Sequence, residues 1–176
     1  MLTFIKKIIF SSIKTKKLKQ KNSLKNSDET ILQIGEALSH QIAKRFKRAL
    51  AIRFVDAGSC NACELEVHAV NNPYYNLERF NIHFVASPRH ADLLLVTGPV
   101  TRNMKESLQK TYEAMPFPKL VIALGDCAHC GGVFKNSDAI IGAVNKVIPV
   151  NYVITGCPPS PIAIMQGILK AVSIKT

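Results

Sequence analysis

The chain has 176 residues, of which 47% are hydrophobic and 20% are charged. This composition excludes a disordered chain and indicates one folded domain with its own core. The net charge of +11 is concentrated at one end: residues 1–53 hold 13 Lys and Arg against 3 Asp and Glu (+10), and residues 54–176 hold 10 against 9 (+1). Because a nucleic-acid-binding domain carries its basic face on the fold itself, this distribution argues against nucleic acid as a partner.

Residues 1–26 form a basic N-terminal arm with eight lysines and no acidic residue. Its apolar residues fall on one helical face and are Leu2, Ile5, Ile9 and Ile13. The pattern is typical either of a short amphipathic helix on an anionic membrane surface or a partner, or of a solvated tail, and the sequence leaves both open. The sequence predicts no transmembrane helix, no secretory signal and no twin-arginine export signal.

Residues 27–50 are predicted to form an amphipathic helix, with Ser27 or Asp28 as its N-terminal cap. The apolar stripe of this helix consists of Ile31, Ile34, Leu38, Ile42, Phe46 and Leu50. Because these residues recur at the spacing of one helical face, we expect the stripe to pack against the rest of the chain.

Residues 51–176 form the α/β domain, in which strand and helix patterns alternate. Strands are predicted at residues 52–55, 81–86, 92–97, 120–124 and 152–155. Helices are predicted within residues 60–76, over residues 101–115, and from Ser160-Pro161, where a capping residue precedes Pro at the first helical position. The chain is therefore expected to be an α/β protein with a flavodoxin-like, open, mostly parallel sheet, helices on both faces, and an N-terminal helical arm.

The five cysteines come directly after three of the predicted strands, at positions 60, 63, 127, 130 and 157. The carboxyl ends of parallel strands meet at one edge of a sheet, and ligands bind in the crevice beyond that edge. The sequence therefore predicts that the three cysteine-bearing loops form one thiolate site. Glycines flank the cysteines and let the backbone approach closely with its N–H groups directed inward.

Three kinds of site fit these cysteines to different degrees. A structural zinc on Cys60, Cys63, Cys127 and Cys130 has the right number of thiolates, but 63 residues separate the pairs, far more than in a compact zinc ribbon. A redox-active dithiol at Cys60 and Cys63 leaves the other cysteines unexplained. An iron–sulfur cluster on four thiolates uses the convergence of the loops best, although spacing alone leaves all three open.

Four motifs give the chain a family resemblance that covers about residues 54–172. They are DAGSCNACELE (56–66), SPRHADLLLVTGPVT (87–101), ALGDCAHCGGVF (123–134) and GCPPSP (156–161). In this order and spacing they resemble the small iron–sulfur subunit of group 4 membrane-bound [NiFe] hydrogenases, of the formate hydrogenlyase and energy-converting type. That subunit is homologous to the 20-kDa subunit of complex I, which has two adjacent cysteines where this chain has Cys60-x-x-Cys63.

The resemblance implies a cofactor, its ligands and a set of partners. One [4Fe-4S] cluster would be held by Cys60, Cys63, Cys127 and Cys157, which leaves Cys130 as a free, buried thiol. The cluster would relay electrons between a [NiFe] large subunit and a ferredoxin-like iron–sulfur subunit, in a complex with integral membrane subunits. The chain would then act in an oxidoreductase complex whose catalytic metal is on a partner chain, and would lie peripherally at the cytoplasmic face of the inner membrane.

Two other functions remain possible at this point. One is a complex-I-type NADH–quinone oxidoreductase subunit, whose cluster passes electrons to quinone. The other is a zinc-stabilised scaffold with no redox role.

Four further residues near the motifs have roles that the sequence leaves open. Glu66 orients the ligand loop, faces the large subunit, or is an ordinary solvated carboxylate. Arg89 and Asp92 form an ion pair or an interface contact. His129 lies in a cysteine-bearing loop and is a candidate donor to a cluster sulfur.

Overall fold

The computed structural model describes residues 21–174, with side chains from residue 27 onward. Residues 1–30 and residues 31–176 form two compact units. The described part of the first unit, residues 21–30, is helical and is the first part of α2 (Lys21–Phe46). The apolar face predicted for Leu2, Ile5, Ile9 and Ile13 lies outside the described residues. The proposed membrane contact of residues 1–26 therefore stays a prediction.

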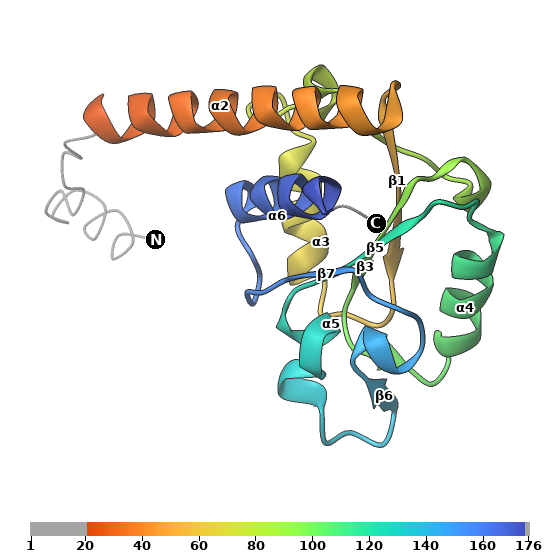
Figure 1. Ribbon diagram of the computed structural model, residues 1–176. Helices are drawn as coiled ribbons and strands as arrows, with labels where there is room; N and C mark the ends of the chain where they lie inside the picture. The colour runs from red at the N-terminus through yellow and green to blue at the C-terminus, as the bar shows by residue number, and fades with distance from the viewer. Residues whose placement is uncertain (1–20, 175–176) are drawn as a thin grey trace, which may run out of the picture. The chain divides into compact units, whose positions relative to one another are not determined.

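The second unit is built on a five-stranded parallel sheet (Figure 1). Its strand order is β2-β1-β3-β5-β7, and every neighbouring pair is parallel. The strands are β1 (Leu50–Asp56), β2 (Ile82–Phe84), β3 (Leu93–Thr97), β5 (Leu120–Leu124) and β7 (Tyr152–Ile154). All residues of β3 and β5 are buried, as expected for apolar strands covered on both faces of a parallel sheet. The predicted α/β fold with an open parallel sheet is confirmed.

Helices cover both faces of this sheet and create two hydrophobic cores. One core joins the sheet to residues 31–42 of α2, to α3 (Ala62–Val70) and to α6 (Pro161–Ser173). The other core lies on the opposite face, with α4 (Lys105–Ala114), α5 (Asp126–Cys130) and the 3-10 helix η4 (Val144–Lys146). The remaining 3-10 helices are η1 (Leu77–Phe80), η2 (Pro88–His90) and η3 (Gly132–Phe134). Among residues 21–174, no helix is long and apolar enough to cross a membrane.

Several element boundaries differ from those expected. The helix predicted over residues 27–50 begins at Lys21 and ends at Phe46, and Leu50 begins β1 instead. Its apolar stripe does pack as expected, since Ile31, Leu38 and Ile42 are almost completely buried in the first core.

A short antiparallel ribbon was not predicted. It pairs β4 (Val100–Thr101) with β6 (Ile140–Gly142). The helix predicted over residues 101–115 starts only at Lys105, because the preceding backbone is used elsewhere. The N–H of Thr101 donates to the carbonyl of Ala57, and the N–H of Arg102 donates to the carbonyl of Ala139.

Candidate metal centre

Three loops at the carboxyl edge of the sheet carry all five cysteines. Cys60 follows β1 and Cys63 lies in the first turn of α3. Cys127 and Cys130 lie in α5, directly after β5, and Cys157 follows β7. Because β1, β3, β5 and β7 are consecutive neighbours in the sheet, these loops meet at one edge, as the sequence predicted.

Two of the cysteines are buried, and the groups that shift their pKa values indicate which thiols interact electrostatically. Burial raises the pKa of Cys63 from 9.0 to about 12, and the remaining upward contributions come from Glu64 and from the thiols of Cys127, Cys60 and Cys157. Burial also raises the pKa of Cys127, with further contributions from Cys157 and Cys60. Each of these four cysteines therefore lies within electrostatic reach of at least one buried thiol of the group.

Cys130 stands apart from this group of four. Its thiol is exposed and donates to the carbonyl of Asp126 over 3.2 Å. It is not among the groups that shift the pKa of Cys63 or Cys127. The prediction that Cys130 is a buried thiol is therefore wrong, because the one-turn helix α5 directs Cys127 inward and leaves Cys130 at the surface.

Two glycines leave room around the buried thiols. A Cβ at Gly125 would lie 2.7 Å from the Cys63 sulfur, and a Cβ at Gly132 would lie 2.6 Å from the Cys127 sulfur. Both glycines have positive φ values, of 91° and 53°, which other residues rarely adopt. The backbone can therefore approach the sulfurs only where no side chain is present. This close backbone cradle fits a cofactor held by thiolates and surrounded by N–H groups.

Hydrogen bonds hold the cysteine-bearing loops in place. One oxygen of Asp126 accepts from the N–H of Gly156 over 2.8 Å, and the N–H of Asp126 donates back to the Gly156 carbonyl over 3.0 Å. This reciprocal pair ties the Cys127 loop to the Cys157 loop. In the first loop, Asp56 accepts from the N–H groups of Gly58 and Ser59. Sequence reasoning missed both aspartates, although each stands at or just after the end of a predicted strand, a common position for loop-fixing acids.

Glu64 is a third residue that the sequence analysis missed. It is 6% exposed, and its Oε1 accepts a hydrogen bond from the hydroxyl of Thr97 at the end of β3. Glu66, which the sequence analysis named as a candidate instead, is only partly buried. Helical spacing distinguishes the two, because the buried face of α3 consists of Cys63, Glu64, Val67 and Val70.

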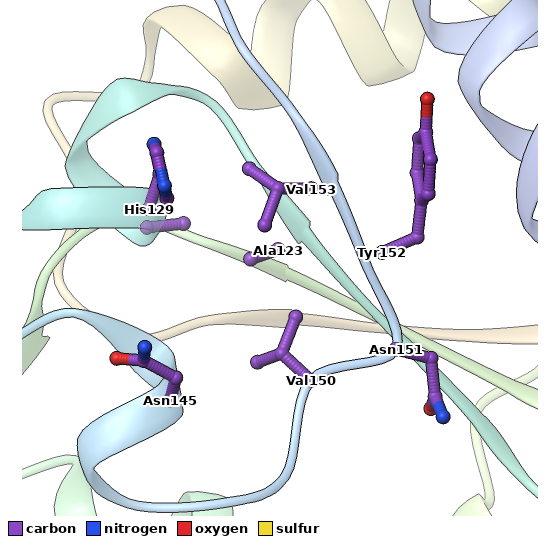
Figure 2. Close-up of a pocket in the computed structure, with 8 residues that line it drawn as sticks. Ala123, His129, Asn145, Val150, Asn151, Tyr152 and Val153 are labelled. Atoms are coloured by element: carbon purple, nitrogen blue, oxygen red, sulfur yellow. The ribbon is translucent and has the colours of Figure 1, made fainter.

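The other candidate residues have different surroundings. Asp92 pairs with Arg48 over 2.5 Å at the amino end of β3, and Arg89 is exposed. The expected pair of Arg89 with Asp92 is therefore not formed. His129 is exposed and lines a cavity of about 410 Å³, together with η4 and the segment around β7. Figure 2 shows His129 and Asn145 at one side of this cavity, with none of the cysteines among its lining residues.

Within residues 21–174, no three His, Cys, Asp or Glu side chains are placed to coordinate a single metal ion. A four-iron cluster is a different kind of ligand, because it takes one thiolate at each iron and so separates its ligands more widely than one ion does.

The fold and the site define a class of protein: a parallel α/β domain with cysteines in three loops at the carboxyl edge of its sheet. Within this class, the chain belongs to the family described as NADH ubiquinone oxidoreductase, 20 Kd subunit, whose model matches residues 60–171. The family expected from the sequence motifs is confirmed.

Similar proteins include subunits of membrane-bound oxidoreductase complexes. The chain is 40% identical over 147 residues to formate hydrogenlyase subunit 7 of Escherichia coli (strain K12). The matched region covers 84% of this chain but only 56% of that protein. It is 44% identical over 131 residues to the probable membrane-bound hydrogenase subunit mbhJ of Pyrococcus furiosus, covering 74% of this chain and 78% of that one. A solved structure of the membrane-bound sulfane sulfur reductase, an archaeal respiratory membrane complex, matches with a TM-score of 0.64 and 36% identity, over 77% of this chain and 73% of that chain.

Proposed function

We propose that the chain is the electron-transfer subunit of a complex-I-like membrane-bound hydrogenase, and that it holds one [4Fe-4S] cluster on Cys60, Cys63, Cys127 and Cys157. The observation that carries this proposal is the grouping of these four thiols from three separate loops, with Cys130 outside the group. The number of thiols equals the number of irons in such a cluster.

The residues around the thiols fit this cofactor. A bound cluster would supply one-electron transfer, and the chain would supply its ligands, its surroundings and its position relative to partners. Burial raises the pKa values of Cys63 and Cys127 and so favours their protonated forms, and a bound cation such as iron would stabilise the thiolates instead. A backbone hydrogen bond from Val133 lowers the pKa of Cys127, so this loop already directs an N–H group at a sulfur.

The partners follow from the family and remain part of the proposal. All four clustered cysteines are used by the cluster, so the [NiFe] centre belongs to a separate large subunit. A ferredoxin-like iron–sulfur subunit would exchange electrons with the chain from its other side, and integral membrane subunits would hold the assembly. The chain would lie peripherally at the cytoplasmic face of the membrane.

Metal analysis of the purified full-length chain tests the cluster. We expect about four irons and four labile sulfides per chain, and a spectroscopic signal from the reduced cluster. Replacement of Cys60, Cys63, Cys127 or Cys157 by Ser should remove iron or change the cluster type. Cys130→Ser is the matched control and should leave the iron content unchanged. Zinc without iron, or loss of iron in the Cys130 variant alone, would contradict the assignment.

The activity of the intact complex separates the remaining functions. The three similar proteins described above are named for different activities: formate hydrogenlyase, hydrogenase and sulfane sulfur reductase. Hydrogen evolution from a reduced viologen, with nickel in the isolated complex, would support the hydrogenase. A nickel-free complex that reduces quinone or sulfane sulfur would refute the hydrogenase while leaving the electron relay intact.

A further inference from the structure

The carboxylate of Glu64 is unusual because it is buried next to Cys63, a proposed cluster ligand, and, within residues 27–174, only one of its two oxygens accepts a hydrogen bond. Oε1 accepts from the Thr97 hydroxyl, whereas Oε2 is buried without a hydrogen-bond partner in the described part of the chain. Thr97 is itself completely buried. Burying a carboxylate with an unpaired oxygen is costly, and such groups occur mostly where they have a function.

The neighbourhood of Glu64 contains the proposed ligands and no positively charged partner for it. Glu64 is the next residue after Cys63, in the first turn of α3. After burial itself, Glu64 makes the largest contribution to the raised pKa of the Cys63 thiol, ahead of the three other thiols. No salt bridge joins Glu64 to Lys, Arg or His among residues 27–174. The carboxylate therefore lies next to the cysteine site without a paired cation among these residues.

Two structural roles compete with an electrostatic one. The hydrogen bond to Thr97 ties the start of α3 to the end of β3, which would position Cys63. An acidic residue in the first turn also stabilises a helix through its dipole. Both roles predict changes in stability or cluster loading, but neither requires the electron affinity of a correctly loaded cluster to change.

We propose that the buried carboxylate of Glu64, beyond tying α3 to β3, lowers the reduction potential of the cluster held by Cys60, Cys63, Cys127 and Cys157. The inference rests on the proposed function, since it needs the cluster to be present. Reduction adds an electron, so a fixed negative charge nearby disfavours the reduced state.

The test is a redox titration of the reconstituted full-length chain, followed by electron paramagnetic resonance at one pH. Glu64→Gln keeps an oxygen to accept from Thr97 and removes the charge. At a solution potential where the wild-type cluster is half reduced, we expect the ratio of reduced to oxidised cluster to rise about tenfold, which corresponds to about 59 mV for a one-electron couple. Glu66→Gln removes a charge two residues further along the same helix, from a more exposed position, and should change the ratio much less.

Thr97→Val provides an independent variant with the opposite expected sign. It keeps the charge of Glu64 and removes the hydroxyl that offsets part of it, so the ratio should fall below that of the wild type. Loaded Glu64→Gln protein with the wild-type ratio would overturn the inference, and so would Glu66→Gln shifting the ratio as much. If Glu64→Gln does not retain a cluster, a Thr97→Val ratio at or above the wild-type value overturns it. A wild-type chain without iron would instead refute the proposed function.

Discussion

Replacing Gly132 by alanine tests the close contact between the backbone and a buried thiol. A Cβ at this position would lie 2.6 Å from the sulfur of Cys127 and 3.1 Å from its Cα. The residue also has a φ of 53°, where a side chain costs about 1–2 kcal/mol. Overpacking against Cys127 adds about 1–3 kcal/mol. We therefore expect Gly132→Ala to lower the free energy of unfolding by about 2–5 kcal/mol in total.

Gly131→Ala is the matched control, because it changes the neighbouring residue, which also has a positive φ, of 89°. Its added Cβ would meet Lys135, at 3.1 Å from the Lys135 Cβ, and the sulfur of Cys127 is not among its three nearest neighbours. The free energy of unfolding of this variant should fall mainly by the cost of the positive φ, about 1–2 kcal/mol. Both variants are therefore destabilised, but only Gly132→Ala displaces a proposed ligand.

Two measurements separate these effects. Urea unfolding of the cluster-free full-length chain gives the loss of stability, and iron content after reconstitution gives the loss of the site. We expect Gly132→Ala to bind much less iron than Gly131→Ala, even where both remain folded. Equal iron contents in the two variants, or a greater loss in Gly131→Ala, would refute the reasoning.

Three further predictions concern single interactions. Arg48→Ala leaves the nearly buried Asp92 without its ion pair and should lower the free energy of unfolding by about 1–3 kcal/mol, measured by urea unfolding; an unchanged midpoint would contradict it. In cluster-free protein between pH 7 and 9, Cys63 should react with iodoacetamide far more slowly than Cys130, because its raised pKa of about 12 keeps the thiol protonated and its side chain is buried; equal rates by peptide mass mapping would contradict it. Asn61 has a φ of 71° and its side chain makes no capping hydrogen bond, so Asn61→Gly should leave the thermal midpoint unchanged. Asn61→Ala should lower the free energy of unfolding by about 1 kcal/mol and so lower the midpoint, and equal midpoints for the two variants would argue against the left-handed conformation.

The parts of the fold that the sequence predicted well are those determined by local patterns. The run at 120–124 is wholly apolar because β5 is buried on both faces, and the pattern showed this directly. Ser160 does cap α6, accepting from the N–H of Ala163, as its place before Pro161 indicated. The ribbon of β4 and β6 could not be predicted, because its two short strands are joined only by contacts about 40 residues apart in sequence.

The same distinction applies to the cysteines. Convergence of three loops follows from parallel topology, so it was predictable once the strands were placed. The exposure of Cys130 could not be predicted, because this exposure depends on α5 ending at Cys130, just before the left-handed Gly131. That Glu64 and not Glu66 is buried could have been predicted, because the apolar residues Val67 and Val70 define the inward face of α3 and Glu64 lies on that face.

The strongly basic composition of the chain has little bearing on the electrostatics of the site. The balance of residues 54–176 is only +1 (10 Lys and Arg against 9 Asp and Glu), and the groups that shift Cys63 and Cys127 are acids, thiols and a backbone N–H, with no Lys or Arg among them. At Cys127 a backbone N–H already offsets thiolate charge, while the buried Glu64 would oppose electron uptake by a cluster bound there, as proposed above. With the proposed cluster in place, such surroundings would favour its oxidised state and would suit it to exchange electrons with strongly reducing partners.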